Sequence, residues 1–395
     1  MASLTLSEVA AGAGVSPATV RRWRRAGLIP LADGVWTPAA AAHVRMVARM
    51  RERGHSLAEI RRAAESGQFA PAFIEELLPS GTPSYDVRAA AAATGLEEET
   101  IERITTALGV GGLRAGELTA GDVEMLRYYS ALLGAGMPLE AILQLARVYG
   151  QAFAQIADAE VRLVHIHVHE PLMREGVPAL QIAEQMEGMA AATLPLAAPI
   201  MDYLHGLYLR HFIEEDLIGH MEGEVRREGP ELGRMRVALA FADLAGYTRL
   251  TEERGEQAAV RAVERFVEAV QRTLPVGARI IKHLGDGVMI VAADPVALCG
   301  WAVDFLEQIP AGVPPPRIGV HCGEVLYRDG DYFGRDVNQV ARVVARAGPG
   351  EVLVTGAVVD AARGSTGIRF HPLGPVGLKG FAQPTELFRA SMPEG

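Results

Sequence analysis

The spacing of apolar positions along the chain changes near residue 232. Before that point apolar residues recur every three or four positions, as in "LSEVAAGAGVSPATVRRW", where Val20 and Trp23 would share the inner side of one helix. Ser16-Pro17 places a capping residue before a helix-starting proline. Residues 1–80 are therefore predicted to form a helix-turn-helix followed by further helices.

A second segment repeats the first. "YDVRAAAAATGLEEETIERI" aligns with "LSEVAAGAGVSPATVRRW" so that Gly95 lies 81 residues after Gly14, and "GMPLEAI" aligns with "GHSLAEI" so that Leu139 lies 82 residues after Leu57. One residue inserted in a loop accounts for the change of spacing. We expect two copies of one unit, packed on each other.

The pattern stays helical up to about residue 231. "QAFAQIADAEVRLVHIHVHEP" is predicted to continue a helix up to Pro171. The next segment is rich in Ala, Leu and Met, and we expect Pro195 and Pro199 to break it.

Strand-like apolar runs alternate with helical runs from about residue 232 to 391. "MRVALAFADL", "ARIIKHL", "GVMIVAA", "PRIGVHCGEV" and "GEVLVTG" are predicted strands, and helices are expected between them. The fold class is multidomain, with all-α regions followed by an α+β domain. We place the domains at residues 1–80, 83–225 and 232–391.

Composition narrows the class of protein. The chain has 395 residues, 49% hydrophobic and 22% charged, which is typical of two to four globular domains. A net charge of −10 argues against general binding to nucleic acid or anionic membrane, and two cysteines give neither a disulfide framework nor a Cys-rich zinc module. We find no signal-peptide pattern and no stretch of about 18 apolar residues, so a cytoplasmic protein without a membrane span is expected.

The two copies of the repeat differ in charge. Residues 1–70 hold ten Arg against five Asp or Glu, a balance of +5, whereas residues 83–150 hold five Arg against nine, a balance of −4. The arginines of "TVRRWRR" suit DNA phosphates, and a solvated helix face is the alternative. The second copy carries glutamates there and cannot lie against DNA.

Two aspartates are candidates for metal ligands. Asp243 follows an apolar strand in "VALAFADL", and Asp286 lies in "IIKHLGDGVMIV" between two strands, where Gly285-Asp286-Gly287 reads as a hairpin turn. If these strands are neighbours, the two carboxylates converge, and they repel unless a cation lies between them. Oxygen ligands favour Mg²⁺ or Mn²⁺, which also hold phosphates. Each aspartate alone could equally be a turn or cap residue.

Asn338 and Arg342 are four apart in "RDVNQVARVVARA" and share one helical face, where an amide beside a guanidinium suits phosphate. The motifs "F-x-D-L-x-x-Y-T", "K-x-x-G-D-G", "R-I-G-V-H-x-G-E-V", "D-Y-F-G-x-x-V-N-x-x-A-R" and "L-K-G" follow in this order. Residues 232–391 thereby resemble the class III nucleotide cyclases. The resemblance implies a domain with a ferredoxin-like fold, and an enzyme that converts ATP to 3′,5′-cyclic AMP and pyrophosphate.

Site roles follow from that resemblance. It implies that Asp243 and Asp286 bind two Mg²⁺ or Mn²⁺ ions, that Lys282 and Asp331 read adenine, and that Asn338 orients the ribose. Arg342 would stabilise the transition state and Lys379 would contact the terminal phosphates. Guanylate cyclases carry Glu and Cys or similar residues at the two base-reading positions, so ATP is the expected substrate. The family's sites are shared between subunits, which implies a homodimer with two sites.

The N-terminal segments resemble two further families. "LSEVAAGAGVSPATVRRW", "AGLIP" and "GHSLAEI" resemble the MerR winged helix-turn-helix, although "LADGVW" is a shortened wing. "LTAGDVEMLRYYSALLGAGMPLEAILQLARVYGQAFAQIADAEVRL" resembles the helical regulatory domain of actinobacterial class III adenylate cyclases. That resemblance implies control of the cyclase by pH, with a fatty-acid-like ligand as a further effector. A DNA-binding regulator that uses the cyclase domain as nucleotide sensor and dimeriser is the alternative function.

Three histidines alternate in "VHIHVHEP": His165, His167 and His169. In a helix His165 and His169 share a face and His167 points elsewhere, so three metal ligands do not converge. A zinc hydrolase is disfavoured, because neither HExxH spacing nor a Cys/His set is present. The cluster is either partly solvated or a pH-responsive joint between regulator and cyclase.

Overall fold

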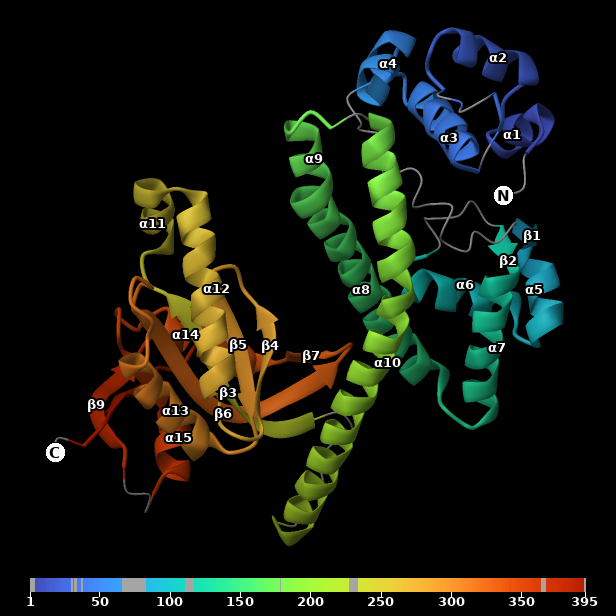
Figure 1. Cartoon of the computed structure of the whole chain (residues 1–395). Coiled ribbons are helices and arrows are strands. Elements are labelled where there is room, and N and C mark those ends of the chain that lie inside the picture. Colours follow the sequence, from blue (N-terminus) through green and yellow to red (C-terminus); the bar gives the residue numbers. More distant parts are fainter. Residues whose placement is uncertain are drawn as a thin grey trace. The chain divides into compact units, whose positions relative to one another are not determined.

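A computed structural model describes residues 4–29, 31, 34–36, 38–65, 83–110, 117–177, 179–226, 234–363 and 367–393. The chain forms two compact units, Met1–Leu209 and Arg210–Gly395. Figure 1 shows that the first is helical and that the second holds a sheet with helices.

Four short helices open the first unit: α1 (Leu6–Gly12), α2 (Pro17–Arg25), α3 (Pro38–Glu52) and α4 (Leu57–Glu65). Ser16 caps α2 by accepting a hydrogen bond from the backbone N–H of Thr19 at 3.1 Å. Val20 and Trp23 are buried together, as their spacing predicts. Part of the wing segment lies outside the described residues, and Trp36 at its end forms a bridge with Leu4.

The same elements recur in the same order after residue 83. They are β1 (Pro83–Tyr85), α5 (Val87–Thr94), α6 (Glu98–Ala107), β2 (Leu118–Thr119), α7 (Ala120–Gly134) and the start of α8 (Leu139–Val164). Tyr85 pairs with Leu118, which repeats the bridge between Leu4 and Trp36 at the aligned positions. Gly14 and Gly95 both have positive φ, 64° and 74°, in the turn between the two helices of each copy.

Long helices follow, and the last of them, α10, continues past Leu209 into the second unit. α8 runs into a π-helical turn, η2 (His165–His169), and then into α9 (Glu170–Arg174), so the helical path continues past Pro171. α10 (Ala179–Arg226) contains Pro195 and Pro199 without interruption, so the prediction that they break the helix is wrong. Each proline removes one backbone donor, and the two lie four apart on one side, so the other hydrogen bonds hold the helix together.

The second unit is an α+β domain. Its strands are β3 (Arg234–Leu244), β4 (Ala278–His283), β5 (Gly287–Ala292), β6 (Pro316–Arg328), β7 (Asp331–Phe333), β8 (Val352–Thr355), β9 (Arg369–Val376) and β10 (Thr385–Ser391). Its helices are α11 (Tyr247–Arg254), α12 (Glu256–Thr273), α13 (Pro295–Glu307), α14 (Arg335–Val344) and α15 (Gly356–Ala361). The strand order is β4-β5-β3-β6-β8-β10-β9, and β7 pairs with β6. β6 and β8 are parallel, and the other pairs are antiparallel.

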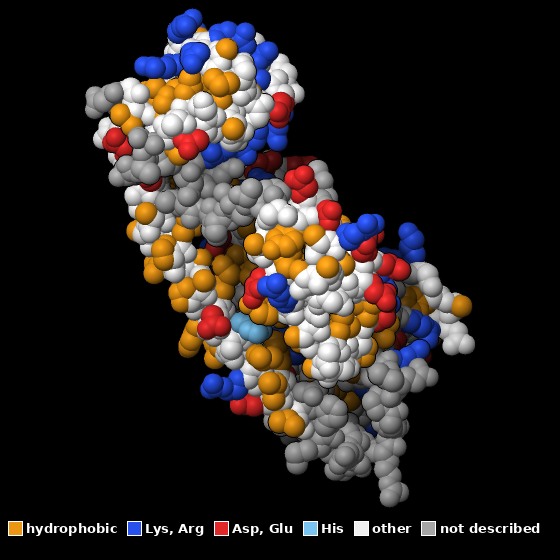
Figure 2. Space-filling view, turned by 90° about the vertical axis from the view of Figure 1, so that its right-hand side faces the viewer, with side chains coloured by type: hydrophobic (Ala, Val, Ile, Leu, Met, Phe, Trp, Pro, Cys, Tyr) orange, Lys and Arg blue, Asp and Glu red, His pale blue; other side chains and the backbone are white. Residues whose placement is uncertain are grey.

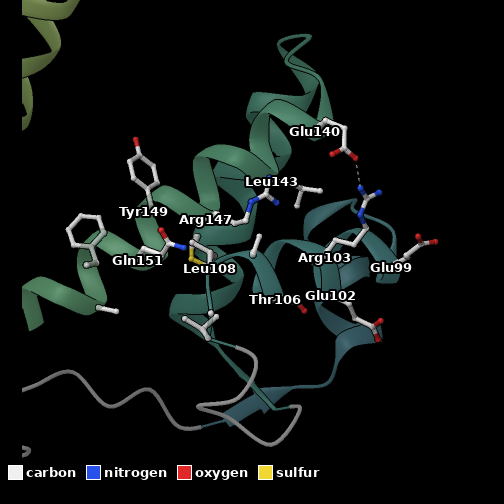
Figure 3. A pocket seen from close by; sticks show the side chains of 17 residues that line it. Glu99, Glu102, Arg103, Thr106, Leu108, Glu140, Leu143, Arg147, Tyr149 and Gln151 are labelled. Atoms are coloured by element: carbon white, nitrogen blue, oxygen red, sulfur yellow. Dashed lines mark hydrogen bonds and ion pairs between the residues drawn. The ribbon is translucent and has the colours of Figure 1, made fainter. Parts of the chain in front are cut away.

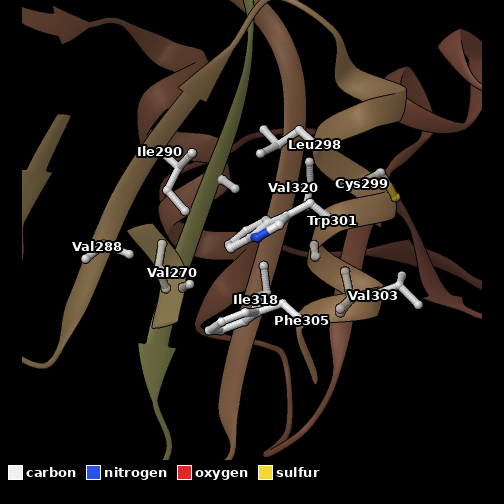
Figure 4. Packing of buried hydrophobic residues seen from close by; sticks show 14 of the residues in the cluster. Val270, Val288, Ile290, Leu298, Cys299, Trp301, Val303, Phe305, Ile318 and Val320 are labelled. Atoms are coloured by element: carbon white, nitrogen blue, oxygen red, sulfur yellow. The ribbon is translucent and has the colours of Figure 1, made fainter. Parts of the chain in front are cut away.

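Alternation along β3 divides the core into two sides. Ala238, Ala240 and Ala242 pack on the side of α12, α13 and α15, where Figure 4 shows Trp301 and Phe305 of α13 against β6. Val237, Leu239 and Phe241 pack on the other side, against α14. Because side chains alternate in a strand, Asp243 lies on the α14 side of the sheet.

Candidate active site

The two predicted metal ligands come together. Asp243 is the last residue but one of β3 and is paired in register with Gly287, the residue after Asp286 in the turn between β4 and β5. The backbone N–H of Leu244 donates to the carbonyl of Asp286 at 3.1 Å. A Cβ at position 287 would lie 2.8 Å from the carbonyl oxygen of Ala242, so only glycine allows this approach. Burial and the neighbouring Asp243 carboxylate raise the pKa of Asp286 above its usual value.

The carboxylate pair fits a divalent cation that also binds phosphate. Among the residues that the structure describes, no three His, Cys, Asp or Glu side chains converge in the manner of a closed metal site. Two carboxylates that leave the remaining ligand positions to water and substrate phosphates are the donor set typical of Mg²⁺. Arg317 of β6 donates from Nε and a terminal nitrogen to Oδ2 of Asp243, at 2.9 and 2.5 Å. Sequence reasoning missed Arg317, although it stands opposite Asp243 in the register.

Lys282 and Asp331, the predicted base-reading residues, form an ion pair. Nζ of Lys282 on β4 lies 2.5 Å from Oδ2 of Asp331 on β7, and both side chains are partly exposed. The other carboxylate oxygen of Asp331 accepts a hydrogen bond from the backbone N–H of Tyr332 at 2.8 Å. A paired donor and acceptor thus face solvent at the edge of the sheet.

Asn338 and Arg342 lie exposed on α14, whose opposite face buries Val340, Val343 and Val344. Asp336, in the first turn of this helix, fixes it to β6, because Oδ2 accepts a hydrogen bond from the backbone N–H of Glu324 at 2.8 Å. His321 lies 3.7 Å from the same carboxylate and lowers the pKa of Asp336.

Lys379 is exposed in the loop after β9, beside the buried Leu378. Within the described ranges, no hydrogen bond or ion pair joins the side chain of Asn338, Arg342 or Lys379 to the other predicted site residues. The structure therefore forms two pairs, Asp243 with Asp286 and Lys282 with Asp331, and leaves these three side chains apart from them.

The histidine cluster has the helical geometry that the sequence predicts for two of its members. His165 and His169 lie on one face with their Nδ1 atoms 3.1 Å apart, and His167 is exposed. His169 is 1% exposed and lies on the π-helical turn. Among the described residues no three His, Cys, Asp or Glu side chains form a group that could hold a metal ion, so the three histidines do not converge on one site.

Paired carboxylates near a strand end, a cation-acid pair between β4 and β7 and an Asn/Arg helix carry the candidate chemistry of this α+β domain. Residues 6–213 match the model of the adenylate cyclase regulatory domain, and residues 233–389 match the adenylate and guanylate cyclase catalytic domain. The chain belongs to the family of proteins with an adenylate cyclase regulatory domain, and it is a class III adenylate cyclase.

Similar proteins come from several bacteria. An uncharacterized protein of Mycobacterium tuberculosis H37Rv is 29% identical over 370 residues, 90% of this chain and 92% of the relative. A pH-sensitive adenylate cyclase of M. tuberculosis CDC 1551 is 27% identical over 303 residues, 75% of each. An adenylate cyclase of Streptomyces coelicolor is 29% identical, covering 73% and 74%. The adenylyl cyclase CyaB of P. aeruginosa is 21% identical, with a TM-score of 0.37, 41% of this chain and 96% of that one.

Within the part of the chain that the structure describes, no helix has the length and apolar character needed to cross a membrane.

Proposed function

We propose that the protein converts ATP to 3′,5′-cyclic AMP and pyrophosphate in a homodimer with two shared sites, under the control of residues 1–225. The observation that carries this proposal is the approach of Asp243 to Asp286 on the same unit as the Lys282–Asp331 pair. Asp243 and Asp286 would hold two Mg²⁺ or Mn²⁺ ions. Bound there, the ions would lower the pKa of the ribose 3′-hydroxyl and neutralise the phosphates.

Adenine recognition by Lys282 and Asp331 has a chemical basis. The ammonium group donates to N1 of adenine, and the carboxylate accepts from the exocyclic amine. Guanine presents the reverse pattern at these two positions, which leaves a donor against a donor and an acceptor against an acceptor. The ion pair between the two residues would open to admit the base.

Asn338, Arg342 and Lys379 supply the remaining polar contacts. Their exposure on α14 and on the loop after β9 leaves them accessible to a substrate. Asn338 would fix the ribose, and Arg342 would stabilise charge that develops on the oxygens of the α-phosphate in the transition state. Lys379 would bind the terminal phosphates. Positioning and charge stabilisation suffice for such a transfer, so no side chain need act as general base.

The apolar surface of α10 supports a homodimer. Large hydrophobic side chains are exposed along the helix: Leu196, Ile200, Tyr203, Leu204, Leu207, Tyr208, Leu209, Phe212, Ile213 and Leu217. Exposed apolar patches of this kind mark interaction sites in soluble proteins. Leu196, Ile200, Tyr203 and Leu207 follow the spacing of one helical face. A second copy of the same helix would cover this face symmetrically, which fits an isologous dimer.

A cyclase assay with Mn²⁺ and ATP tests the proposal. Wild-type dimer should form cyclic AMP, and Asp286→Ala should lower kcat by about a thousandfold, because the carboxylate pair is lost. Asp360→Ala is the matched control, since Asp360 forms only an exposed pair with Arg363 at 2.7 Å. A purified wild-type dimer that forms no cyclic AMP refutes the proposal.

The histidine pair supports pH control. His169 is buried against His165, and protonation of both rings would place two charges 3.1 Å apart. One relative is named a pH-sensitive adenylate cyclase. Replacing His165, His167 and His169 together by Gln should flatten the pH–activity curve of the full chain, whereas His55→Gln should not. Coincident pH profiles of the full chain and residues 225–395 would rule out a sensor in the N-terminal region.

A cavity of about 1060 Å³ beside α6 and α8 is the proposed effector site (Figure 3). Leu108, Leu143 and Phe153 give it apolar walls, and Glu99, Glu102 and Glu140 also line it. Arg103 is paired with Glu140 at 2.6 Å, so Arg147 is the cation proposed to bind the head group of a fatty carboxylate. Oleate should raise the melting temperature of the chain, and Arg147→Gln should reduce that rise. Arg162→Gln, an exposed arginine paired with Asp158, is the control.

DNA binding by a MerR-like winged helix is a second function, supported by the arginines of α2. Arg21, Arg22, Arg24 and Arg25 are all exposed, and Figure 2 shows Lys and Arg side chains spread over the surface of the N-terminal helices. In a gel-shift assay the full chain should bind a DNA duplex with an affinity that falls steeply as the salt concentration rises. Arg21→Gln with Arg22→Gln should make the dependence of the binding constant on salt concentration less steep. Arg88→Gln, on the second copy, should change nothing. Binding without salt dependence would refute this function.

A further inference from the structure

Arg279 on β4 contacts two residues in the last third of α10. The Cζ atom of Arg279 lies 5.0 Å from the centre of the Phe212 ring, and a terminal nitrogen lies 3.7 Å from Oε2 of Glu215. Gly277 has a φ of 77°, and a Cβ there would stand 3.5 Å from the other oxygen of Glu215. All four residues belong to the second unit, so these contacts attach the last part of α10 to the edge of the sheet.

The same guanidinium reaches β7. A second terminal nitrogen of Arg279 donates to the hydroxyl oxygen of Tyr332 at 2.6 Å. Tyr332 is 3% exposed and packs among Val325, Val340 and other residues on the α14 side of the sheet. Arg279 therefore contacts both α10 and the buried Tyr332.

Tyr332 in turn determines the place of Asp331. Its backbone N–H donates to Oδ1 of Asp331, while Oδ2 pairs with Lys282. β7 is a strand of three residues that pairs only with β6 among the described strands, so the buried Tyr332 is its main anchor. Two contacts, Arg279 with Tyr332 and Lys282 with Asp331, thus connect β4 with β7.

A β-bulge places both contacts on one side of the sheet. Arg279 and Lys282 are three apart, and in a regular strand they would point to opposite faces. The register shifts between Ile280 and Lys282, so that Arg279 pairs with Val291 and Lys282 pairs with Met289. Val291 and Met289 both belong to the core on the α14 side.

We propose that Arg279 is a positioning residue for base recognition, which holds Tyr332, and through it Asp331, in place opposite Lys282, and which Phe212 and Glu215 of α10 hold in turn. The inference rests on the adenine-reading role proposed for Lys282 and Asp331. It goes further because it gives Arg279 and Tyr332, which contact no substrate, a role in the affinity for the base. It also gives α10 a direct contact to that site.

Steady-state kinetics of the full-length dimer test the first link. Arg279→Gln and Tyr332→Phe should each raise the KM for ATP about tenfold and lower the preference for ATP over GTP, with a much smaller change in kcat. Arg279→Lys keeps a cation and should recover part of the loss. Arg272→Gln is the matched control, because Arg272 forms an exposed pair with Glu268 on α12.

The second link is tested by removing the α10 contacts alone. Phe212→Leu with Glu215→Gln should shift KM and base preference in the same direction as Arg279→Gln, while Glu268→Gln should not. Two results with an active enzyme overturn this inference alone. One is that Tyr332→Phe leaves the KM for ATP and the ATP/GTP preference unchanged. The other is that the variant loses kcat equally with both nucleotides and has a lower melting temperature. An inactive wild type overturns the proposed function, and this inference with it.

Discussion

His43 predicts acid destabilisation of the N-terminal helices. It lies on α3, is 5% exposed, and stands next to the buried Ala42 and Val44. Burial lowers the pKa of His43 from 6.5 to about 4, and the nearby backbone of Leu28, which favours the charged ring, opposes this only in part. The folded unit therefore keeps the ring neutral where the unfolded chain protonates it. Stability is complete above pH 6.5, falls as the pH drops from 6.5 towards 4, and levels off below 4.

The magnitude follows from the two pKa values. Each pH unit between them is worth about 1.4 kcal/mol, so the full loss is about 3 kcal/mol. At pH 5 the loss is about 2 kcal/mol of the free energy of unfolding, a large part of the stability of a small helical unit. His43→Leu removes this dependence. Any cost of replacing the ring that does not depend on pH cancels when the free energies of unfolding at pH 7 and pH 5 are subtracted.

Hydrogen exchange of the full chain measures the effect. Opening free energies from amides of α3 should fall by about 2 kcal/mol more in wild type than in His43→Leu between pH 7 and pH 5. His55→Leu is the control, since His55 is exposed on the same unit, and it should behave as wild type. Equal pH dependence in wild type and His43→Leu would show that His43 takes up its proton without opening the fold, and the reasoning would be wrong.

Three further predictions concern catalysis. Gly323→Ala should lower kcat by about a hundredfold without unfolding the protein, because its Cβ would fall 2.0 Å from Oδ2 of Asp336 and displace α14; unchanged kinetics beside an unchanged circular dichroism melt would contradict it. Lys282→Glu combined with Asp331→Cys should reverse the preference for ATP over GTP in a competition assay, and retained ATP selectivity would exclude these residues as base readers. Asp286→Ala and Arg342→Ala, each inactive alone, should regain part of the wild-type rate when co-expressed, because the mixed dimer restores one shared site; a mixture as inactive as its parts would argue against shared sites.

Local patterns predicted the parts of the site that depend on neighbouring residues. Asp243 follows a run of apolar residues long enough to be a buried strand, and Gly285-Asp286-Gly287 separates two more, so a hairpin beside the Asp243 strand was foreseeable. The repeat was foreseeable because capping residues and turn glycines occupy aligned positions. β9 and β10 were not predicted. Pro372, Gly374 and Pro375 give β9 a poor strand pattern, and only pairing with β10 identifies it.

Contacts between distant segments stayed hidden for a different reason. Arg317 lies 74 residues from Asp243, and Tyr332 lies 53 residues from Arg279, so no local spacing connects them. The continuity of α10 through two prolines was equally hidden. A proline predicts the loss of one backbone hydrogen bond and does not predict whether the rest of a long helix can tolerate it.

The bulge in β4 explains why alternation alone would misplace Lys282, one of the two proposed base-reading residues. A strict period of two assigns Lys282 to the side of Ile280, which packs with α12 and α13, and separates it from Arg279. One extra residue on an edge strand reverses that assignment and brings both cations to face β7. Because the same face of β4 then carries the contact to α10 and the Lys282–Asp331 pair, a shift of α10 that moves Arg279 must also act on that pair. A regular β4 would carry these contacts on opposite faces, and a movement of α10 could reach the Lys282–Asp331 pair only through the core.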